Sequence, residues 1–199
     1  GGACSYWYGI VSDSLVSNNV ANAAGGIDRG RVSNCVVIAN SATNGNAGGI
    51  NLTADQPGQY AVDCTIVSNT TTGIGGGIYL QADGQVIGCR ITGNSASNQS
   101  AGIHLYRTTN ALVRNCLIAG NYSKNPGTAS GVTLSDIRGG ATVVESCTII
   151  SNGVESGFSM HTNAYVTNCI MASNGWNRLT DLLGVSGASI TNIYYSCCP

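Results

Sequence analysis

Short apolar-polar alternations recur along the whole chain and predict short β-strands rather than helices. In residues 61–80, Cys64 and Ile66 alternate with the polar Thr65, and Gly77-Ile78 opens a second alternating stretch. A period of two apolar positions is typical of a strand with one buried face. The segment is too short to bury that face alone, so we interpret it as one coil of a solenoid.

Three marks of this coil return in the same order. A cysteine recurs at intervals of 29, 25, 27, 31 and 22 residues, namely Cys35, Cys64, Cys89, Cys116, Cys147 and Cys169. Five residues after each cysteine stands an asparagine, namely Asn40, Asn69, Asn94, Asn121, Asn152 and Asn174. A glycine followed by an apolar residue then closes the coil, as in Gly49-Ile50 and Gly131-Val132. Self-similarity at a period of 20 to 50 residues indicates a repeat architecture.

Each repeat contains three candidate strands. One precedes the cysteine and carries an apolar residue two or three positions before it (Val32, Val62, Val86, Val113, Val144, Val166), one is Cys-x-Ile, and one is the Gly-Ile-x-Leu stretch. Asn or Asp often stands directly before the cysteine, where its tolerance of left-handed backbone suits a corner. Three short strands per rung predict a triangular coil, and stacking makes its inward positions a continuous core. We expect seven to eight rungs, about 35 Å of rod at roughly 4.8 Å per rung.

The repeat covers nearly the whole chain, so we predict one domain, residues 1–199. Residues 1–10 hold the aromatic cluster Tyr6-Trp7-Tyr8, and residues 11–198 hold the repeats. We interpret the cluster as a cap on the first rung, with a sugar-stacking platform as the alternative. In that rung Asp13 occupies the place expected for the cysteine, and Asn18 that of the asparagine.

Charge is sparse and balanced, with 8 basic and 9 acidic residues making up 9% of the chain. Nucleic acid and anionic membranes demand a basic surface, so neither is expected as a partner. No apolar run approaches the roughly 20 residues of a membrane span. The 28 glycines and only 3 prolines suit many tight turns.

The paired motifs resemble the repeats of bacterial surface proteins of the polymorphic outer-membrane protein type. The resemblance lies in Gly48-Gly49-Ile50 and Gly76-Gly77-Ile78, and in apolar-x-x-Asn elements such as Val37 to Asn40 and Ile66 to Asn69. It implies an all-β fold, a right-handed parallel β-helix, and a place outside the cell or on its surface. This chain has Ile where that family favours Phe, and the resemblance does not extend to a membrane anchor.

The cysteine ladder allows three interpretations. On stacked strands the six residues form buried free thiols that pack as small apolar groups, vertical disulfides, or a metal site. Nine cysteines are an odd number, so at least one thiol stays free or pairs between chains. Cys4, Cys197 and Cys198 lie near the ends of the chain and are our candidates for inter-chain contact.

The asparagine ladder is interpreted as an internal amide stack with a structural role. Four asparagines begin N-x-S/T sequons and are candidate glycosylation sites if the protein is secreted, namely Asn51, Asn69, Asn98 and Asn121. Outward positions of the Gly-Ile strand form a polar stripe that could meet a glycan or a protein partner, namely Asp28, Asn51, Tyr79, His104, Thr133 and Ser159.

The acidic residues occupy positions that are not equivalent between repeats, and no carboxylate pair stands on adjacent rungs of that stripe. They are Asp13, Asp28, Asp55, Asp63, Asp83, Asp136, Glu145, Glu155 and Asp181. Glycoside hydrolysis needs two facing carboxylates, and a calcium-assisted lyase needs clustered acids. His104 and His161 are weak catalytic candidates. We therefore predict no enzyme activity, no cofactor and no metal.

The sequence thus favours an extracellular structural protein, a fibre or adhesin building block that associates end to end. A carbohydrate-binding or polysaccharide-degrading module is the alternative, with Tyr79 and His104 on its binding face. A third interpretation is a fragment of a longer autotransporter or adhesin with the same fold.

Overall fold

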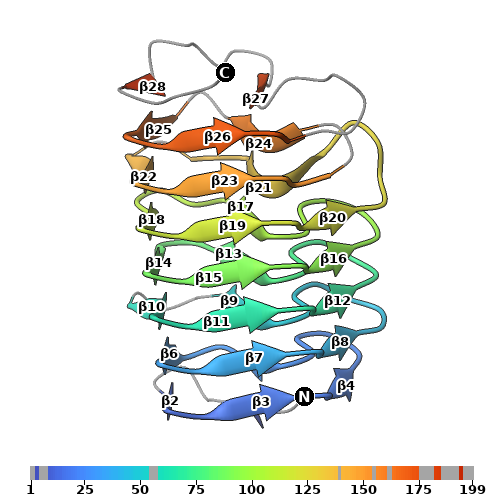
Figure 1. Cartoon of the computed structure of the whole chain (residues 1–199). Helices are drawn as coiled ribbons and strands as arrows, with labels where there is room; N and C mark the ends of the chain where they lie inside the picture. Colours follow the sequence, from blue (N-terminus) through green and yellow to red (C-terminus); the bar gives the residue numbers. More distant parts are fainter. Residues whose placement is uncertain are drawn as a thin grey trace.

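The computed structural model describes residues 3–4, 9–53, 58–138, 140–153, 156–160, 163–174, 182–184 and 193–194. These residues form strands and no helix. The strands stack turn upon turn into a rod, with the first strands of the sequence at the lower end and the last strands at the upper end (Figure 1). Strands of successive turns pair in parallel, as in Ile66 with Ile91. The predicted all-β parallel solenoid is confirmed.

Four parallel sheets run along the rod. Sheet A holds the Gly-Ile strands, namely β1 (Ala3–Cys4), β5 (Ile27–Asp28), β9 (Ile50–Thr53), β13 (Ile78–Gln81), β17 (Ile103–Tyr106), β21 (Ala129–Ser135), β24 (Ser156–Met160) and β27 (Leu182–Gly184). Sheet B precedes the cysteines, with β2 (Ile10–Ser12), β6 (Arg31–Ser33), β10 (Gln59–Val62), β14 (Gly84–Ile87), β18 (Leu112–Arg114), β22 (Thr142–Glu145), β25 (Ala164–Thr167) and β28 (Ile193–Tyr194).

Sheet C follows the cysteines, with β3 (Leu15–Ser17), β7 (Val36–Ile38), β11 (Thr65–Val67), β15 (Arg90–Thr92), β19 (Leu117–Ala119), β23 (Thr148–Ile150) and β26 (Ile170–Ala172). Sheet D follows the asparagines, with β4 (Val20–Ala21), β8 (Ser41–Ala42), β12 (Thr70–Thr71), β16 (Ser95–Ala96) and β20 (Tyr122–Ser123).

A rung therefore has four strands where three were expected. The strands of sheet D have two residues each, and small or polar side chains such as Ala42 and Thr71 point inward there, so no apolar alternation marks them. Sheet D has five strands, so the described residues contain five complete four-strand turns, slightly fewer than the seven to eight rungs expected. Sheets A and B nevertheless have eight strands each and sheet C has seven, because the last turns lack a strand in sheet D among the described residues.

Left-handed backbone turns the chain at two corners of each rung. The residue before the cysteine position has a positive φ, as predicted, in Asn34 (51°), Asp63 (52°) and Asn115 (54°). The residue before the ladder asparagine also has a positive φ, as in Ser68 (55°) and Ala39 (55°). The cysteine itself lies in the corner, because strand C begins one residue later.

The core is a column of stacked apolar side chains. Ile50, Ile78 and Ile103 lie above one another on sheet A and are fully buried. On sheet B the inward residue of β10 is Ala61 rather than the expected Val62, which is half-exposed. Because side chains of the same kind stack in successive turns, each turn has the same width, and the turns stack without strain.

Candidate functional site

Sheet A carries the predicted outward stripe in register. The pairings place Asp28 beside Asn51, Asn51 beside Tyr79, Tyr79 beside His104, and His104 beside Thr133 and then Ser159. The stripe is not an open surface, however. Tyr79 is 5% exposed and His104 is 1% exposed, and Thr133 and Ser159 are also buried. The expectation that these four side chains face a glycan directly is therefore wrong for this conformation.

Three rings form a cluster on this stripe. Tyr79 and His104 stack with centroids 5.8 Å apart and planes at 19°, and Tyr106 lies 6.4 Å from Tyr79. The guanidinium of Arg107 lies 4.8 Å from the Tyr106 ring centroid, within cation–π range. Sequence reasoning missed Tyr106 and Arg107, although Tyr106 stands two residues after His104 and so faces the same side.

His104 is neutral in this environment. Burial lowers the pKa of the imidazole to about 4, since the charged ring would lose its hydration. Its Nδ1 has no hydrogen-bond partner. Burial likewise raises the pKa of Tyr79 to about 12. The cluster is an apolar, uncharged patch of the sheet near neutral pH.

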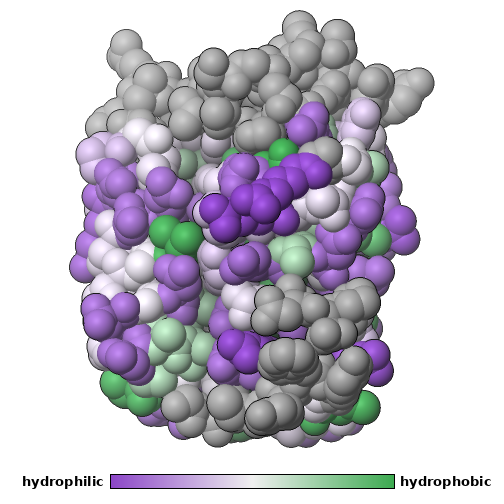
Figure 2. Space-filling view, turned by 180° about the vertical axis from the view of Figure 1, so that it is seen from behind, coloured by the Kyte–Doolittle hydropathy of each residue, from purple (hydrophilic) through white to green (hydrophobic). Residues whose placement is uncertain are grey.

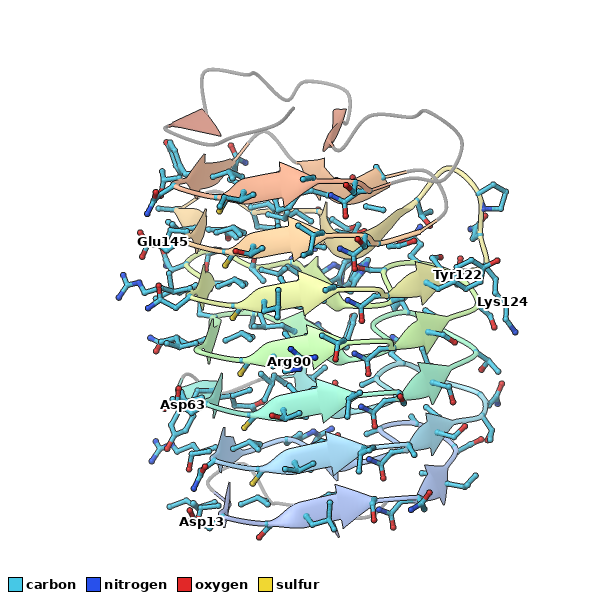
Figure 3. All side chains as sticks on the ribbon, viewed as in Figure 1. Asp13, Asp63, Arg90, Tyr122, Lys124 and Glu145 are labelled. Atoms are coloured by element: carbon cyan, nitrogen blue, oxygen red, sulfur yellow. The ribbon has the colours of Figure 1, made fainter. Side chains whose placement is uncertain are left out.

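Several of the described acids join adjacent turns. Asp136 pairs with Arg107 at 2.9 Å and with Arg138 at 3.4 Å, and Glu145 pairs with Arg114. In Figure 3 the labelled Asp13, Asp63 and Glu145 lie at different turns along one edge of the rod. Asp55, Glu155, Asp181 and His161 lie outside the described residues.

Asp83 shows how such a carboxylate works. Its Oδ1 accepts hydrogen bonds from the backbone N–H groups of Thr109 and Asn110 and from the Thr109 hydroxyl, at 3.0, 2.7 and 2.6 Å. Burial alone would raise the pKa of the carboxyl, but these bonds outweigh it and lower the pKa. Asp83 therefore holds the loop of the next turn in place through these hydrogen bonds.

The six ladder cysteines form a buried column of free thiols. Figure 3 shows the sulfur atoms recurring at the same place in successive turns. Each thiol donates to the carbonyl two residues before it, as Cys64 Sγ does to Val62 O at 3.2 Å. Several also reach a carbonyl of the preceding turn, as Cys89 does to Ala61 O at 3.4 Å.

The six ladder asparagines form a buried amide stack. Asn69 donates its backbone N–H and its Nδ2 to Asn94 Oδ1, at 2.9 and 3.0 Å, and Nδ2 also reaches Val37 O at 2.9 Å. The same bonds recur from turn to turn. Asn19, and not Asn18, begins this ladder, because it donates to Asn40 Oδ1.

A one-residue shift explains that difference. Ser14, and not Asp13, stands at the cysteine position of the first turn, since its carbonyl accepts from Val36 N as Cys35 O accepts from Thr65 N. Its hydroxyl donates to Ser12 O at 2.6 Å, as the thiols do in later turns. Asp13 and Asn18 occupy the two left-handed corners. Ser14 and Asn19 are five residues apart, as each ladder cysteine and its asparagine are, and this spacing could have shown the correct register from the sequence.

The sequons differ in accessibility. Asn69 and Asn121 are fully buried and their Nδ2 atoms are hydrogen-bonded within the ladder. A glycan on either is incompatible with this fold, which corrects two of the four candidates. Asn51 is half-buried and donates to Asp28 at 2.7 Å. Asn98 is exposed.

The first turn exposes three large apolar side chains. Ile10, Leu15 and Val20 are 66%, 67% and 71% exposed, on sheets B, C and D respectively. Figure 2 shows hydrophobic side chains at both lower corners of the rod, level with that turn, on an otherwise largely hydrophilic face. Cys4 lies in β1, which pairs with β5. The Cys4 side chain, Cys197 and Cys198 lie outside the described residues. So does the aromatic cluster Tyr6-Trp7-Tyr8, so its role as a cap on the first rung stays a prediction.

Comparison with protein families agrees with this geometry. The family model described as a right handed beta helix region matches residues 58–197. The chain belongs to this right-handed β-helix family. The family includes both polysaccharide-degrading enzymes and non-enzymatic proteins, so membership alone assigns no activity to this β-helix. No curated protein and no solved structure matches the chain.

Among the residues of the β-helix that the structure describes, no three His, Cys, Asp or Glu side chains are placed to hold a metal ion together. Nor does this part of the chain contain a helix long and apolar enough to cross a membrane.

Proposed function

We propose that the chain is a non-enzymatic structural β-helix of the extracellular space or cell surface, which associates end to end through the edge of its first turn. The observation that carries the proposal is the edge formed by β2, β3 and β4, the end strands of sheets B, C and D. Each of these strands has a partner on one side only among the described strands. A strand edge with unpaired N–H and C=O groups is a template for another chain.

The asparagine ladder determines which hydrogen-bonding groups this edge offers to a partner. Every ladder asparagine from Asn40 to Asn174 accepts through Oδ1 from the turn before it. At the first turn, no donor within the described chain reaches Asn19 Oδ1. A coil that presents an asparagine N–H and amide at this edge would continue the ladder there.

The side chains of the first turn suit the same contact. Equivalent outward positions in the second turn are Arg31, Val36 and Ser41, whereas the first turn has Ile10, Leu15 and Val20. A stacked turn would lie about 4.8 Å away and cover their open side. With a formal net charge of −1, copies repel one another only weakly.

Light scattering after gel filtration, over a range of protein concentrations, tests the proposal. The wild-type chain should form oligomers that lengthen with concentration, and Leu15→Lys/Val20→Lys should stay monomeric because charge on a strand edge disfavours pairing. Leu117→Lys is the matched control, since Leu117 faces outward on the same sheet in the middle of the rod. A wild-type chain that is monomeric throughout would contradict the proposal.

A carbohydrate-binding or polysaccharide-degrading module is the second candidate, supported by the Tyr79–Tyr106 stack with Arg107 beside it. Only the half-exposed Tyr106 and the exposed Arg107 offer accessible surface there. This candidate predicts that Tyr106→Ala abolishes binding to an oligosaccharide array while the fold is kept. Binding that survives this change would eliminate the stack as a sugar site.

A further inference from the structure

The outward stripe of sheet A is closed in its middle by two stacked side chains. Tyr79 and His104 point away from the core, since each stands between two core residues of its strand, yet they are only 5% and 1% exposed. Their rings stack with centroids 5.8 Å apart. Thr133 lies on the other side of His104 and is also buried. A solute can reach this part of the stripe only if a side chain moves.

The side chains around the imidazole of His104 provide no counter-ion. Its neighbours on the outward face of sheet A come from β13, from β17 itself and from β21, namely Tyr79, Gln81, Tyr106, Thr133 and Ser135. None of these side chains is a carboxylate. The Nδ1 atom of His104 has no hydrogen-bond partner. A proton on this ring would therefore be a buried and uncompensated charge, which is costly.

The charged groups in the loops beside His104 are paired with one another. Arg107 follows β17, lies over the Tyr106 ring, and pairs with Asp136 at 2.9 Å. Arg138 pairs with the same carboxylate at 3.4 Å. Asp136, which follows β21, is thus already shared by two cations. A positive charge on His104 would add to those of the two arginines.

The other carboxylates near the stripe are engaged or distant. Asp83, which follows β13, accepts hydrogen bonds from the loop of the next turn. Asp28 is separated from His104 by the two turns that carry Asn51 and Tyr79. Burial is accordingly the cause of the low pKa of His104, about 4, with no contribution from a charged group of the described chain.

The side chain of His104 can regain its hydration without unfolding the rod. Because it points outward, rotation about its side-chain bonds brings the ring to solvent, while the backbone of β17 stays paired with β13 and β21. A proton binds the exposed imidazole, with a pKa of 6.5, about 300 times more tightly than the buried one, with a pKa of about 4. Acid therefore raises the ratio of the open to the closed arrangement by up to that factor.

We propose that protonation of His104 opens the outward stripe of sheet A. The charged imidazole moves from its place between Tyr79 and Thr133 into solvent, and the Tyr79 ring becomes accessible while the strands stay paired. The stripe is closed near neutral pH and opens as the pH falls, with a midpoint between about pH 4 and pH 6.5. This opening involves sheet A alone and is independent of association through the first turn.

Hydroxyl-radical footprinting read by mass spectrometry tests the proposal, because it oxidises exposed side chains at acid and at neutral pH. In the full-length chain, Tyr79 should be protected at pH 7.5, and its oxidation rate should rise about tenfold or more by pH 4. Phe158 and Met171 lie in the core and are fully buried. Both should stay protected over the whole range, with an unchanged β-sheet circular dichroism spectrum.

Variants without a titrating ring identify the trigger. His104→Phe keeps an aromatic ring beside Tyr79 and carries no charge at any pH, so Tyr79 should stay protected down to pH 4. If this variant does not fold, His104→Gln makes the same prediction. His161→Gln removes the other histidine and should keep the rise expected for the wild-type chain.

Three results would overturn the proposal. One is a Tyr79 that stays protected from pH 7.5 to pH 4 in the folded wild-type chain. Another is oxidation of Tyr79 and Met171 with the same midpoint, which would mean that the whole rod unfolds. The third is the same rise in the variant that lacks His104, because the opening would then follow from other groups.

Discussion

Asn69 and Asn94 hold adjacent turns together by two hydrogen bonds to a single oxygen. The backbone N–H and the Nδ2 of Asn69 both donate to Asn94 Oδ1, at 2.9 and 3.0 Å. Both residues are fully buried. In a buried site water cannot replace a lost partner, so each member of the ladder is required by its neighbours.

Asn94→Ala should destabilise the rod by about 3 kcal/mol or more, because the N–H and Nδ2 of Asn69 lose their acceptor and Ile66 O loses its donor. Asn19→Ala is the matched control, since Asn19 is half-buried and donates only to Asn40 and Ser17. Its cost should be about 1 kcal/mol or less. Equilibrium unfolding in urea measures both values, and equal costs would contradict the role of the buried ladder.

Gly77→Ala should cost about 3 kcal/mol, since a Cβ there would meet Gly102 O at 2.7 Å and the Ile91 side chain at 2.9 Å. Gly120→Ala should cost only about 1 kcal/mol, because a Cβ there has open space and the strain comes from its φ of +62° alone. Thermal unfolding followed by circular dichroism compares the two. A smaller loss of stability in Gly77→Ala than in Gly120→Ala would show that adjacent turns can move apart at no cost in free energy.

The stability of the rod should fall as the pH drops through the range in which free histidine titrates. His104 has a pKa of about 4 when folded, below its unfolded value of 6.5. As the pH falls from 6.5 towards 4, the unfolded chain gains a proton that the folded chain does not, so up to about 3 kcal/mol is lost. Above pH 7 this contribution is constant.

His104→Phe should remove that slope, because phenylalanine keeps the ring beside Tyr79 but does not titrate. His161 is present in both proteins, so its contribution cancels in the comparison. Urea unfolding between pH 4 and pH 8 provides the data. An unchanged slope in His104→Phe would assign the pH dependence to other groups.

Glycosylation in a secretory host should occur at Asn98, whose side chain is exposed, and not at Asn69 or Asn121. Asn98→Gln should therefore remove glycan mass from the folded, secreted protein. Mass spectrometry of the purified chain measures that loss. Glycan found on Asn69 in folded material would show that the ladder can open at that turn.

The sequence predicted the solenoid and both ladders because identical residues stack on themselves, so their periodicity is directly visible. It did not predict sheet D, since two-residue strands such as Ser41–Ala42 are too short to show an alternation. It also placed the first turn one residue out of register, because Ser14 replaces cysteine there. The burial of Tyr79 and His104 was not visible either, because alternation distinguishes inward from outward positions but not what lies over an outward side chain.

Electron microscopy of the purified chain at neutral pH, without reductant, tests end-to-end association most directly. The account predicts filaments of one rod diameter for the wild-type chain and for Leu117→Lys, and single short rods for Leu15→Lys/Val20→Lys. Single short rods in all three proteins at every concentration would contradict the association that we propose.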